Sequence, residues 1–515
     1  MFYDYDAIII GGGHNGLICS GYLTGAGLRV LVLEKNSNVG GAIITQELFP
    51  HCFFSTYAFY CYLLHQKIID DFKLRQFGFE IYPFDILRFQ PFLDGNKLLI
   101  YKTLEETQES IKIFSKEDAR SYKNWGEFWY QAAEILYPYF LTQPPTLEEI
   151  AKKLKTKSSK IVFEKLLKSN MRELVFEHFK HPSIRAAFIH AQDVGTSTVK
   201  GGLLCNAYMR CSAFSHPENV GMIKGGAGQL SNALAAAISS MGVKILTNAE
   251  VTNIVVEEGR AQGIVLKDNT RINSRIIVSN LDPKRTFLNL LSEENISSGF
   301  RKSIKNLKTN VGYLKFHAVL NKLPDASKYF EKNFNPRHLA YIKICPTVEY
   351  YEEAWKAACN NDFPSKPVLD INIPTLYDVS IAPSGKHLLS AWASYFPFYL
   401  SKGSWETRRN EAINIILNVL ECYFPNIREC INNCLVLSPV DMETNIGLTN
   451  GNIRHIDMVP EQFLSQRPLM GYSNYKTPIE NLYLCGAGTH PGGEITGAPG
   501  HNAAKKILQD FKVEE

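Results

Sequence analysis

The first forty residues constrain the fold of this chain more than any other segment. An apolar, β-branched run (5–10) leads directly into the glycine-rich turn Gly11–Gly16, and an apolar segment with helical spacing follows. A second apolar run then ends in Glu34, 18 residues after Gly16. Strand, glycine turn, helix, strand and acid in this order are typical of a parallel βαβ unit that binds a dinucleotide.

Each conspicuous residue of this unit has a physical task. Gly11 turns the chain tightly, Gly13 lets the backbone approach a pyrophosphate, and Gly16 lets the helix pack close to the strand. The free N–H groups at the helix N-terminus attract the phosphates. Glu34 is placed to accept hydrogen bonds from both ribose hydroxyls of an adenosine. A 2′-phosphate would be repelled by this carboxylate, so we expect no NADP at this site.

The stretch that follows Glu34 favours FAD over NAD. The pair Gly40–Gly41 lies six residues past the acid, where an NAD enzyme would continue into its next crossover. A glycine pair at this position lets the chain pass close to the phosphates and the flavin. The sequence therefore predicts a flavoprotein.

A second glycine-rich junction lies near the far end of the chain. Residues 481–485 predict a strand, 486–500 are rich in glycine, and the apolar residues after Pro499 repeat with helical spacing. We expect Thr496 to cap this last helix, with Pro499 in its first turn. Such a helix N-terminus would stabilise negative charge on a reduced flavin.

The middle of the chain adds strands but no second nucleotide site. Residues 224–230 are glycine-rich and lead into an Ala-rich helical pattern, which we interpret as a tight helix entry without a ligand. We expect an α/β fold with α+β insertions: a Rossmann-like FAD-binding domain of the glutathione reductase/amine oxidase type, interleaved with a substrate domain. The predicted FAD-binding domain comprises 1–80, 218–300 and 451–515, and the substrate or cap domain 81–217 and 301–450.

Composition excludes several classes of protein. The net charge is +4, from 55 basic and 51 acidic residues, which argues against a nucleic-acid partner. No apolar run reaches the length of a membrane span, and Asp4 and Asp6 stand where a signal peptide would be basic. None of the 11 cysteines forms a CxxC pair, so we expect buried thiols in a reducing compartment. We expect a cytoplasmic protein, with the mitochondrial matrix as the alternative compartment. A peripheral membrane contact is also open, for example through the basic run Lys152–Lys160.

Taken together, the motifs resemble the phytoene desaturase-related branch of the FAD-dependent oxidoreductases. This resemblance implies FAD held non-covalently in a two-domain fold. For the adenosine and pyrophosphate, it implies contacts with Gly11, Gly13, His14, Asn15 and Gly16 at the pyrophosphate, Glu34 and its neighbour Lys35 at the ribose, and the Val251 backbone at the adenine. Along the phosphates and flavin it implies Gly40, Gly41 and Ala42. The C-terminal motif would place Gly486 at the ribityl phosphate, and Glu494, Ile495 and Thr496 at the pyrimidine end of the flavin.

Two residues of the C-terminal motif are candidates for catalysis. Glu494 stands where the carotenoid enzymes usually have glycine, so it either faces the flavin or caps the last helix, and we favour the cap. His490 would contact the flavin, position substrate, or serve as a hydrogen-bonded structural histidine. No metal-ligand or Ser-His-Asp spacing is apparent.

The expected activity is hydride transfer by FAD in desaturation, saturation or isomerisation of a lipophilic substrate, with polyenes included. The electron acceptor would be O2 or a quinone. Aromatic residues at 130–140 and 395–399 most simply fill a core, although they could also line an apolar channel. There are two alternatives. One is an amine oxidase-type enzyme for a smaller polar substrate, and the other is a flavin-carrying regulatory protein with little turnover. The sequence does not predict the oligomeric state.

Overall fold

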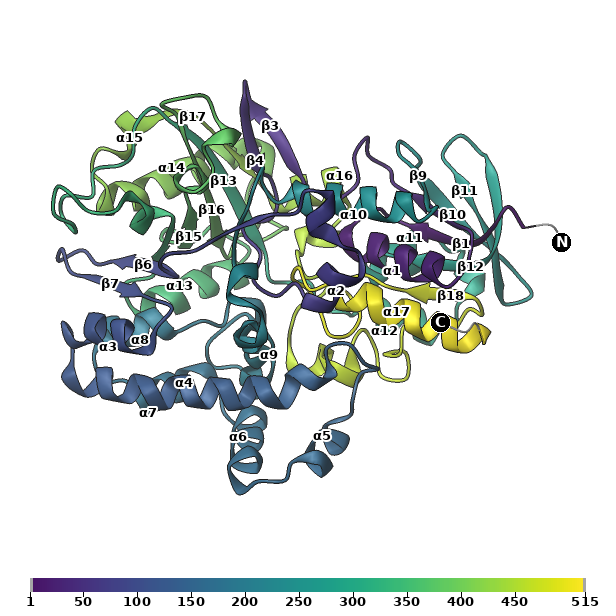
Figure 1. Ribbon diagram of the computed structural model, residues 1–515, viewed down its shortest axis with the longest axis horizontal. Coiled ribbons are helices and arrows are strands. Elements are labelled where there is room, and N and C mark those ends of the chain that lie inside the picture. The colour runs from purple at the N-terminus through teal and green to yellow at the C-terminus, as the bar shows by residue number, and fades with distance from the viewer. Residues whose placement is uncertain (1–2, 513–515) are drawn as a thin grey trace.

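The computed structural model describes residues 3–512, and its helices surround two seven-stranded sheets (Figure 1). The first sheet has the order β10-β11-β12-β1-β2-β9, and β18 pairs with β12. Its strands are β1 (Tyr5–Ile10), β2 (Val30–Leu33), β9 (Lys244–Leu246), β10 (Val251–Glu257), β11 (Arg260–Leu266), β12 (Arg271–Ser279) and β18 (Leu482–Leu484).

Strand β1 lies at the centre of the first sheet because its apolar residues are buried on both faces. It pairs in parallel with β2 and β12, and β12 pairs in parallel with β18. Ala7 and Ile9 belong to the core under helices α1 (His14–Gly25), α10 (Gly228–Ser240) and α17 (Ala498–Phe511). Ile8 and Ile10 face the opposite core, which includes residues of α11 (Pro283–Asn289) and α12 (Ser298–Lys305). Coverage on both faces is the usual requirement of a parallel sheet.

The second sheet has the order β17-β13-β16-β15-β14-β6-β7, and its pairs are antiparallel except for β14 with β6. The long helix α14 (Trp405–Tyr423) packs against one of its faces. The strands are β6 (Arg88–Pro91), β7 (Lys97–Ile100), β13 (Tyr313–Leu320), β14 (Tyr341–Ile344), β15 (Val368–Asn372), β16 (His387–Ser394) and β17 (Ile431–Leu437).

A helical layer lies below the second sheet in Figure 1, with α4 (Lys116–Leu136) as its longest member. Aromatic and aliphatic residues of this layer form the largest core cluster. The remaining elements are α2 (Gln66–Asp71), α3 (Leu104–Lys112), α5 (Leu147–Lys153), α6 (Lys157–Lys168), α7 (Met171–His178), α8 (Pro182–Phe188), α9 (Gly202–Arg210), α13 (Val348–Cys359), α15 (Ile427–Cys430), α16 (Pro439–Ile446), β3 (Thr45–Phe49), β4 (Cys52–Ser55), β5 (Ile81–Pro83) and β8 (Gly221–Ile223).

The two ends of the described chain pack against each other. Helix α17 lies against α1 in Figure 1, and the backbones approach closely at Gly500. A Cβ on Gly500 would lie 2.2 Å from the carbonyl oxygen of Asn15, so only glycine fits there. This contact places the N-terminal and C-terminal glycine turns on the same side of the first sheet.

The sequence-based fold prediction is confirmed in its class and in its main elements. The expected α/β architecture is present, and the strand, helix and strand expected around the first glycine turn are β1, α1 and β2. Most cysteines are buried, and no disulfide occurs among residues 3–512. Within that same range, none of the helices combines the length and the apolar character required to cross a bilayer. The basic run Lys152–Lys160 falls on the largely exposed ends of α5 and α6.

Candidate FAD and substrate cavity

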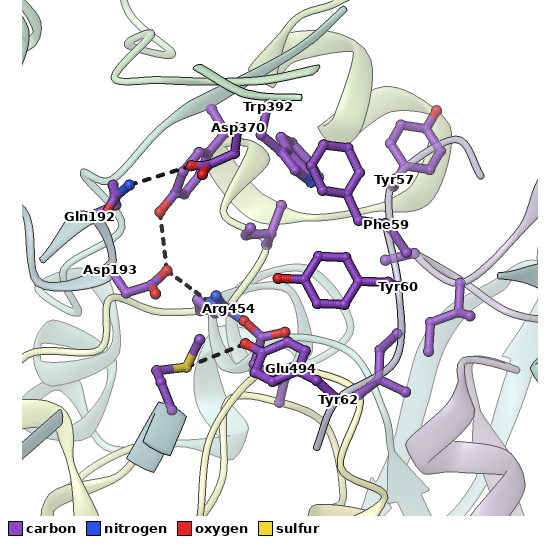
Figure 2. Close-up of a pocket in the computed structure, with 18 of the residues that line it drawn as sticks. Tyr57, Phe59, Tyr60, Tyr62, Gln192, Asp193, Asp370, Trp392, Arg454 and Glu494 are labelled. Carbon is purple, nitrogen blue, oxygen red and sulfur yellow. Dashed lines mark hydrogen bonds and ion pairs between the residues drawn. The ribbon is translucent and has the colours of Figure 1, made fainter. Parts of the chain in front are cut away.

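One cavity of about 550 Å³ is lined by residues of both sheets. Its wall includes the glycine turn after β1, the segment 57–62, the ends of α8 and α9, and the C-terminal residues Glu494 and Ile495. Figure 2 shows the part of this cavity around Arg454. Residues more than 480 positions apart in the sequence therefore share one site.

The dinucleotide end of the cavity is built by the predicted βαβ unit. Gly11, Gly13, His14, Asn15 and Glu34 all line it. The buried Glu34 carboxylate accepts hydrogen bonds from the backbone N–H groups of Gly12 and Asn36, both at 2.9 Å. These bonds fix the acid at the end of β2, where we expect the adenosine ribose.

Two independent observations show that this end fits the FAD pyrophosphate. Nε2 of His14 and Oδ1 of Asn15 are buried without a hydrogen-bond partner among the described residues, so both are free to contact a ligand. A Cβ on Gly13 would lie 2.8 Å from the Asn280 side chain, and one on Gly16 would lie 2.4 Å from the Gly11 carbonyl oxygen. Side chains at these positions would clash, so the glycines keep the turn tight and its backbone open to a phosphate.

The end of the cavity where we expect the flavin, called the flavin end below, is formed where Gly40, Gly41 and Ala42 meet the C-terminal turn. Gly40 donates its backbone N–H to Gly12 at 2.8 Å, which brings the glycine pair beside the first turn. Gly40, Gly41 and Ala42 line the cavity together with Glu494 and Ile495, as the sequence predicts. Gly40 and Gly41 both have positive φ angles, which glycine adopts without strain.

Glu494 does not cap the last helix, so the favoured interpretation of this residue was wrong. Helix α17 begins at Ala498 and has Gly497 at its N-cap position, with Pro499 in the first turn as expected. The Glu494 backbone has a φ of 76°, and its carboxylate forms an ion pair with Arg454 at the cavity wall. Burial raises the pKa of Glu494, and the charge of Arg454 opposes that rise.

Arg454 connects Glu494 with a second carboxylate. Its Nε donates to Asp193 at 3.0 Å, and the hydroxyl of Tyr313 donates to the same Asp193 oxygen at 3.1 Å. Burial works against the guanidinium charge, but Asp193 and Glu494 outweigh it and hold the pKa of Arg454 well above its ordinary value. Arg454 therefore stays charged between two acids (Figure 2).

Aromatic side chains from the segment 57–62 form one wall of the cavity. Figure 2 shows Tyr57, Phe59, Tyr60 and Tyr62 on one side and Asp193 on the opposite side. Nζ of Lys315 donates to the carbonyl of Ala58 at 3.2 Å and anchors the segment from β13. The sequence showed six aromatics between Phe53 and Leu64, but it gave no signal that four of them line the cavity.

A polar cluster around Asp370 forms another part of the wall. The hydroxyl of Tyr341 donates to Asp370 at 2.9 Å, and Nζ of Lys343 and Nε2 of Gln192 each lie 3.4 Å from its carboxylate. These residues come from β14, β15 and a turn after α8, so sequence spacing alone could not bring them together. The cavity is therefore aromatic on one side and charged on the other.

The catalytic assignment of His490 is not supported by its position. His490 is buried outside the cavity wall, and its Nε2 lies 2.8 Å from the carbonyl oxygen of Tyr139. Burial lowers its pKa to about 4, which keeps the ring neutral. Thr496 is likewise outside the wall, and its hydroxyl accepts a hydrogen bond from the N–H of Ala498 at 3.2 Å. Both residues shape the C-terminal turn.

Four further predicted residues do not line the cavity. Gly16 packs against the Gly11 carbonyl, and Gly486 approaches the Asn280 backbone. Nζ of Lys35 donates to the carbonyl of Thr444 at 3.1 Å, and Val251 begins β10 in register with Leu266. The aromatic runs of the substrate region also lie outside the wall: Tyr139, Phe140, Tyr395 and Phe396 are buried in the core, whereas Tyr130 and Tyr399 are exposed.

A cavity that joins a βαβ glycine turn, a glycine pair and a C-terminal glycine turn defines an FAD-dependent oxidoreductase. Residues 16–508 match the family described as flavin containing amine oxidoreductase. The chain belongs to this family, and FAD is its cofactor. The α/β FAD-binding fold expected from the sequence is confirmed.

Known proteins of three kinds are similar to this chain. Pyridine nucleotide-disulfide oxidoreductase domain-containing protein 2 of Mus musculus is 28% identical over 546 residues, covering 99% of this chain and 94% of that protein. A lycopene-forming phytoene desaturase of Paracoccus sp. is 23% identical and covers 98% of this chain and 96% of that protein. Cyclohexylamine oxidase from Brevibacterium oxydans has the same fold, with a TM-score of 0.58, 15% identity and coverage of 99% and 100%. The predicted resemblance to phytoene desaturase-related proteins is confirmed.

Proposed function

We propose that this oxidoreductase moves hydride between FAD and a lipophilic, unsaturated substrate, in desaturation, saturation or isomerisation. The observation that carries this proposal is the aromatic wall of Tyr57, Phe59, Tyr60 and Tyr62, which shares one cavity with the predicted flavin contacts. The similarity to a phytoene desaturase, which acts on a polyene, supports the same substrate class. When bound, FAD would supply a two-electron acceptor for the hydride of a desaturation, with O2 or a quinone as the final electron acceptor, whereas saturation would need a two-electron donor and isomerisation no net redox partner.

The side chains of the cavity would hold FAD and orient the substrate. His14, Asn15 and the glycine turn would bind the pyrophosphate, and Glu34 the ribose. The rings of Phe59 and Tyr60 would stack against the hydrocarbon part of the substrate and exclude water around it.

Glu494 is the group best placed to accept the proton that leaves with a hydride during desaturation. Its carboxylate lines the cavity beside the flavin end, and burial brings its pKa closer to neutral pH. Arg454 would keep that carboxylate oriented through their ion pair.

The charge arrangement favours this function over amine oxidation. An ammonium substrate needs a free carboxylate, but Asp193 and Glu494 already share Arg454, and Asp370 contacts Lys343. These three carboxylates therefore already have cationic partners before any substrate enters. The aromatic wall remains available for apolar contacts.

Anaerobic spectroscopy of the purified yellow protein tests the proposal. Desaturation of an unsaturated lipid should bleach the oxidised flavin, and saturation should restore the absorbance of flavin reduced with dithionite, whereas cyclohexylamine and putrescine should do neither. Protein reduced with dithionite should reoxidise rapidly on mixing with O2 or a short-chain quinone. Bleaching by an amine alone would contradict the proposal, and slow reoxidation by both acceptors would indicate a flavin carrier with little turnover.

A further inference from the structure

Two arginines of the cavity have no carboxylate partner. Arg88 opens β6 and Arg210 ends α9, and both line the same cavity as Glu494. Arg88 donates one Nη2 hydrogen bond to the Ala187 carbonyl at 2.8 Å, while its Nε is buried without a partner. Arg210 lies 4.9 Å from the ring centre of Trp129 and forms no hydrogen bond or ion pair within residues 3–512.

The acids that line the described cavity interact with groups other than Arg88 and Arg210. Asp193 and Glu494 pair with Arg454, and Asp370 contacts Lys343. The two remaining acids accept hydrogen bonds from neutral groups: Asp282 from a backbone N–H and a hydroxyl at the start of α11, and Glu34 from the backbone N–H groups of Gly12 and Asn36. Arg88 and Arg210 are thus the two cations of the described cavity wall that lack an anion.

The buried surroundings of these arginines destabilise their charged form. Burial and the neighbouring charge of Arg88 lower the pKa of Arg210 to about 10, so the Arg210 guanidinium still carries its charge at neutral pH. His190, on the same wall, is held neutral by burial and by the nearby cations Lys343, Arg210, Arg88 and Arg454. A buried charge without a partner is destabilising until an opposite charge binds it.

Aromatic side chains border the two arginines. The guanidinium of Arg88 lies 5.8 Å from the ring centre of Phe188, and the Phe188 ring lies 5.4 Å from Tyr122 and 5.5 Å from Trp125. Tyr122, Trp125 and Phe188 also line the cavity. An anionic group at this point would therefore sit at the end of an apolar surface.

We propose that Arg88 and Arg210 bind the oxyanion of the substrate, a carboxylate or a phosphate, while its hydrocarbon part extends along the aromatic walls. Guanidinium groups bind both oxyanions through charged, forked hydrogen bonds. The proposal rests on the proposed function and narrows its substrate class to lipophilic acids or phosphate esters. The FAD pyrophosphate is not the anion in question, because its cradle at Gly11–Gly16 belongs to the first sheet, whereas β6 belongs to the second.

Calorimetric titration of the FAD-loaded protein tests the proposal without requiring turnover. Decanoate, decyl phosphate and 1-decanol share one chain and differ in the head group. We expect at least one of the two anions to bind about tenfold or more tightly than the alcohol, and added salt to weaken that preference. Preferential binding of one anion identifies the oxyanion that the site takes. Equal binding of all three ligands to the wild-type protein would overturn the proposal by itself.

Matched variants locate the site. Arg88→Met and Arg210→Met should each remove most of the preference for the anion and leave decanol binding unchanged. Arg120→Met, which removes an exposed arginine of α4, should leave the preference intact. Retention of the wild-type preference in both cavity variants would refute the assignment. The FAD content of each protein is measured separately, so loss of flavin binding is distinguished from loss of the anion site.

Discussion

The guanidinium of Arg454 pairs with the carboxylate of Glu494, and this ion pair ties the C-terminal glycine turn to the segment that follows α16. Asp193, in the turn after α8, forms an ion pair with the same guanidinium. One cation therefore connects three segments that meet at the flavin end of the cavity.

Replacement of Arg454 by Met should be strongly destabilising. The variant would leave Asp193 and Glu494 buried without their cation, and breaking such a buried pair costs about 3–5 kcal/mol. Thermal unfolding and FAD content should both fall. The triple variant Arg454→Met with Asp193→Asn and Glu494→Gln should recover much of the loss, because no buried charge then lacks a partner. Equal stability of wild type and Arg454→Met would contradict the role of the ion pair.

The stability of Glu494→Gln relative to wild type should depend on pH. Burial raises the folded-state pKa of Glu494 above the unfolded value of about 4.5. As pH rises between these two values, the unfolded chain releases its proton first, so wild-type stability falls. Gln does not titrate, and its stability relative to wild type should therefore increase from pH 4.5 upward. Chemical unfolding at several pH values measures the difference, and a difference that does not change with pH would disprove the burial effect.

Glu494→Gly should retain FAD and raise its reduction potential. Glycine adopts the positive φ of this position without strain, so the turn should keep its shape. Removal of a nearby anion favours the reduced, negatively charged flavin, and we expect an increase on the order of tens of millivolts. Dye-coupled titration measures the potential. An unchanged potential would show that Glu494 does not influence the flavin.

Glu34→Arg should abolish FAD retention. The arginine would replace the acceptor of the Gly12 and Asn36 N–H groups and bring a cation to the place of the ribose clamp. The purified variant should be colourless, whereas Glu34→Gln, which keeps an acceptor oxygen, should retain part of its flavin. A fully yellow Glu34→Arg protein would refute the assignment of this residue.

Gly500→Ala should loosen the contact between the two ends of the chain. The added methyl group would meet the Asn15 carbonyl oxygen at 2.2 Å, and overpacking of this kind costs typically about 1–3 kcal/mol. FAD affinity should fall as well, since Asn15 lines the pyrophosphate end. Gly126→Ala in α4 is the matched control, because no atom lies within 4 Å of its Cβ position and alanine favours a helix. Its stability should equal or exceed that of the wild type.

Local patterns were sufficient to predict that the first glycine turn and Glu34 lie together at one end of the cavity. Gly11–Gly16 and Glu34 lie within one βαβ unit, so their spacing determines their positions. The substrate half could not be predicted in this way. Arg88, Asp193, Asp370 and Arg454 come from four separate segments, and only the packing of the second sheet and its helices brings them to one wall. The assignment of Glu494 as a cap failed because an acid before a helix does not reveal that a distant arginine will bind it.

The pairing of β18 with β12 joins early and late parts of the chain in one sheet. During synthesis β1 to β12 emerge before the segment from β18 to α17, which brings Glu494 and Ile495 to the cavity and Gly500 against Asn15. We therefore expect stable flavin uptake only once β18 and α17 have packed, so that FAD acts as a late stabilising partner of the protein.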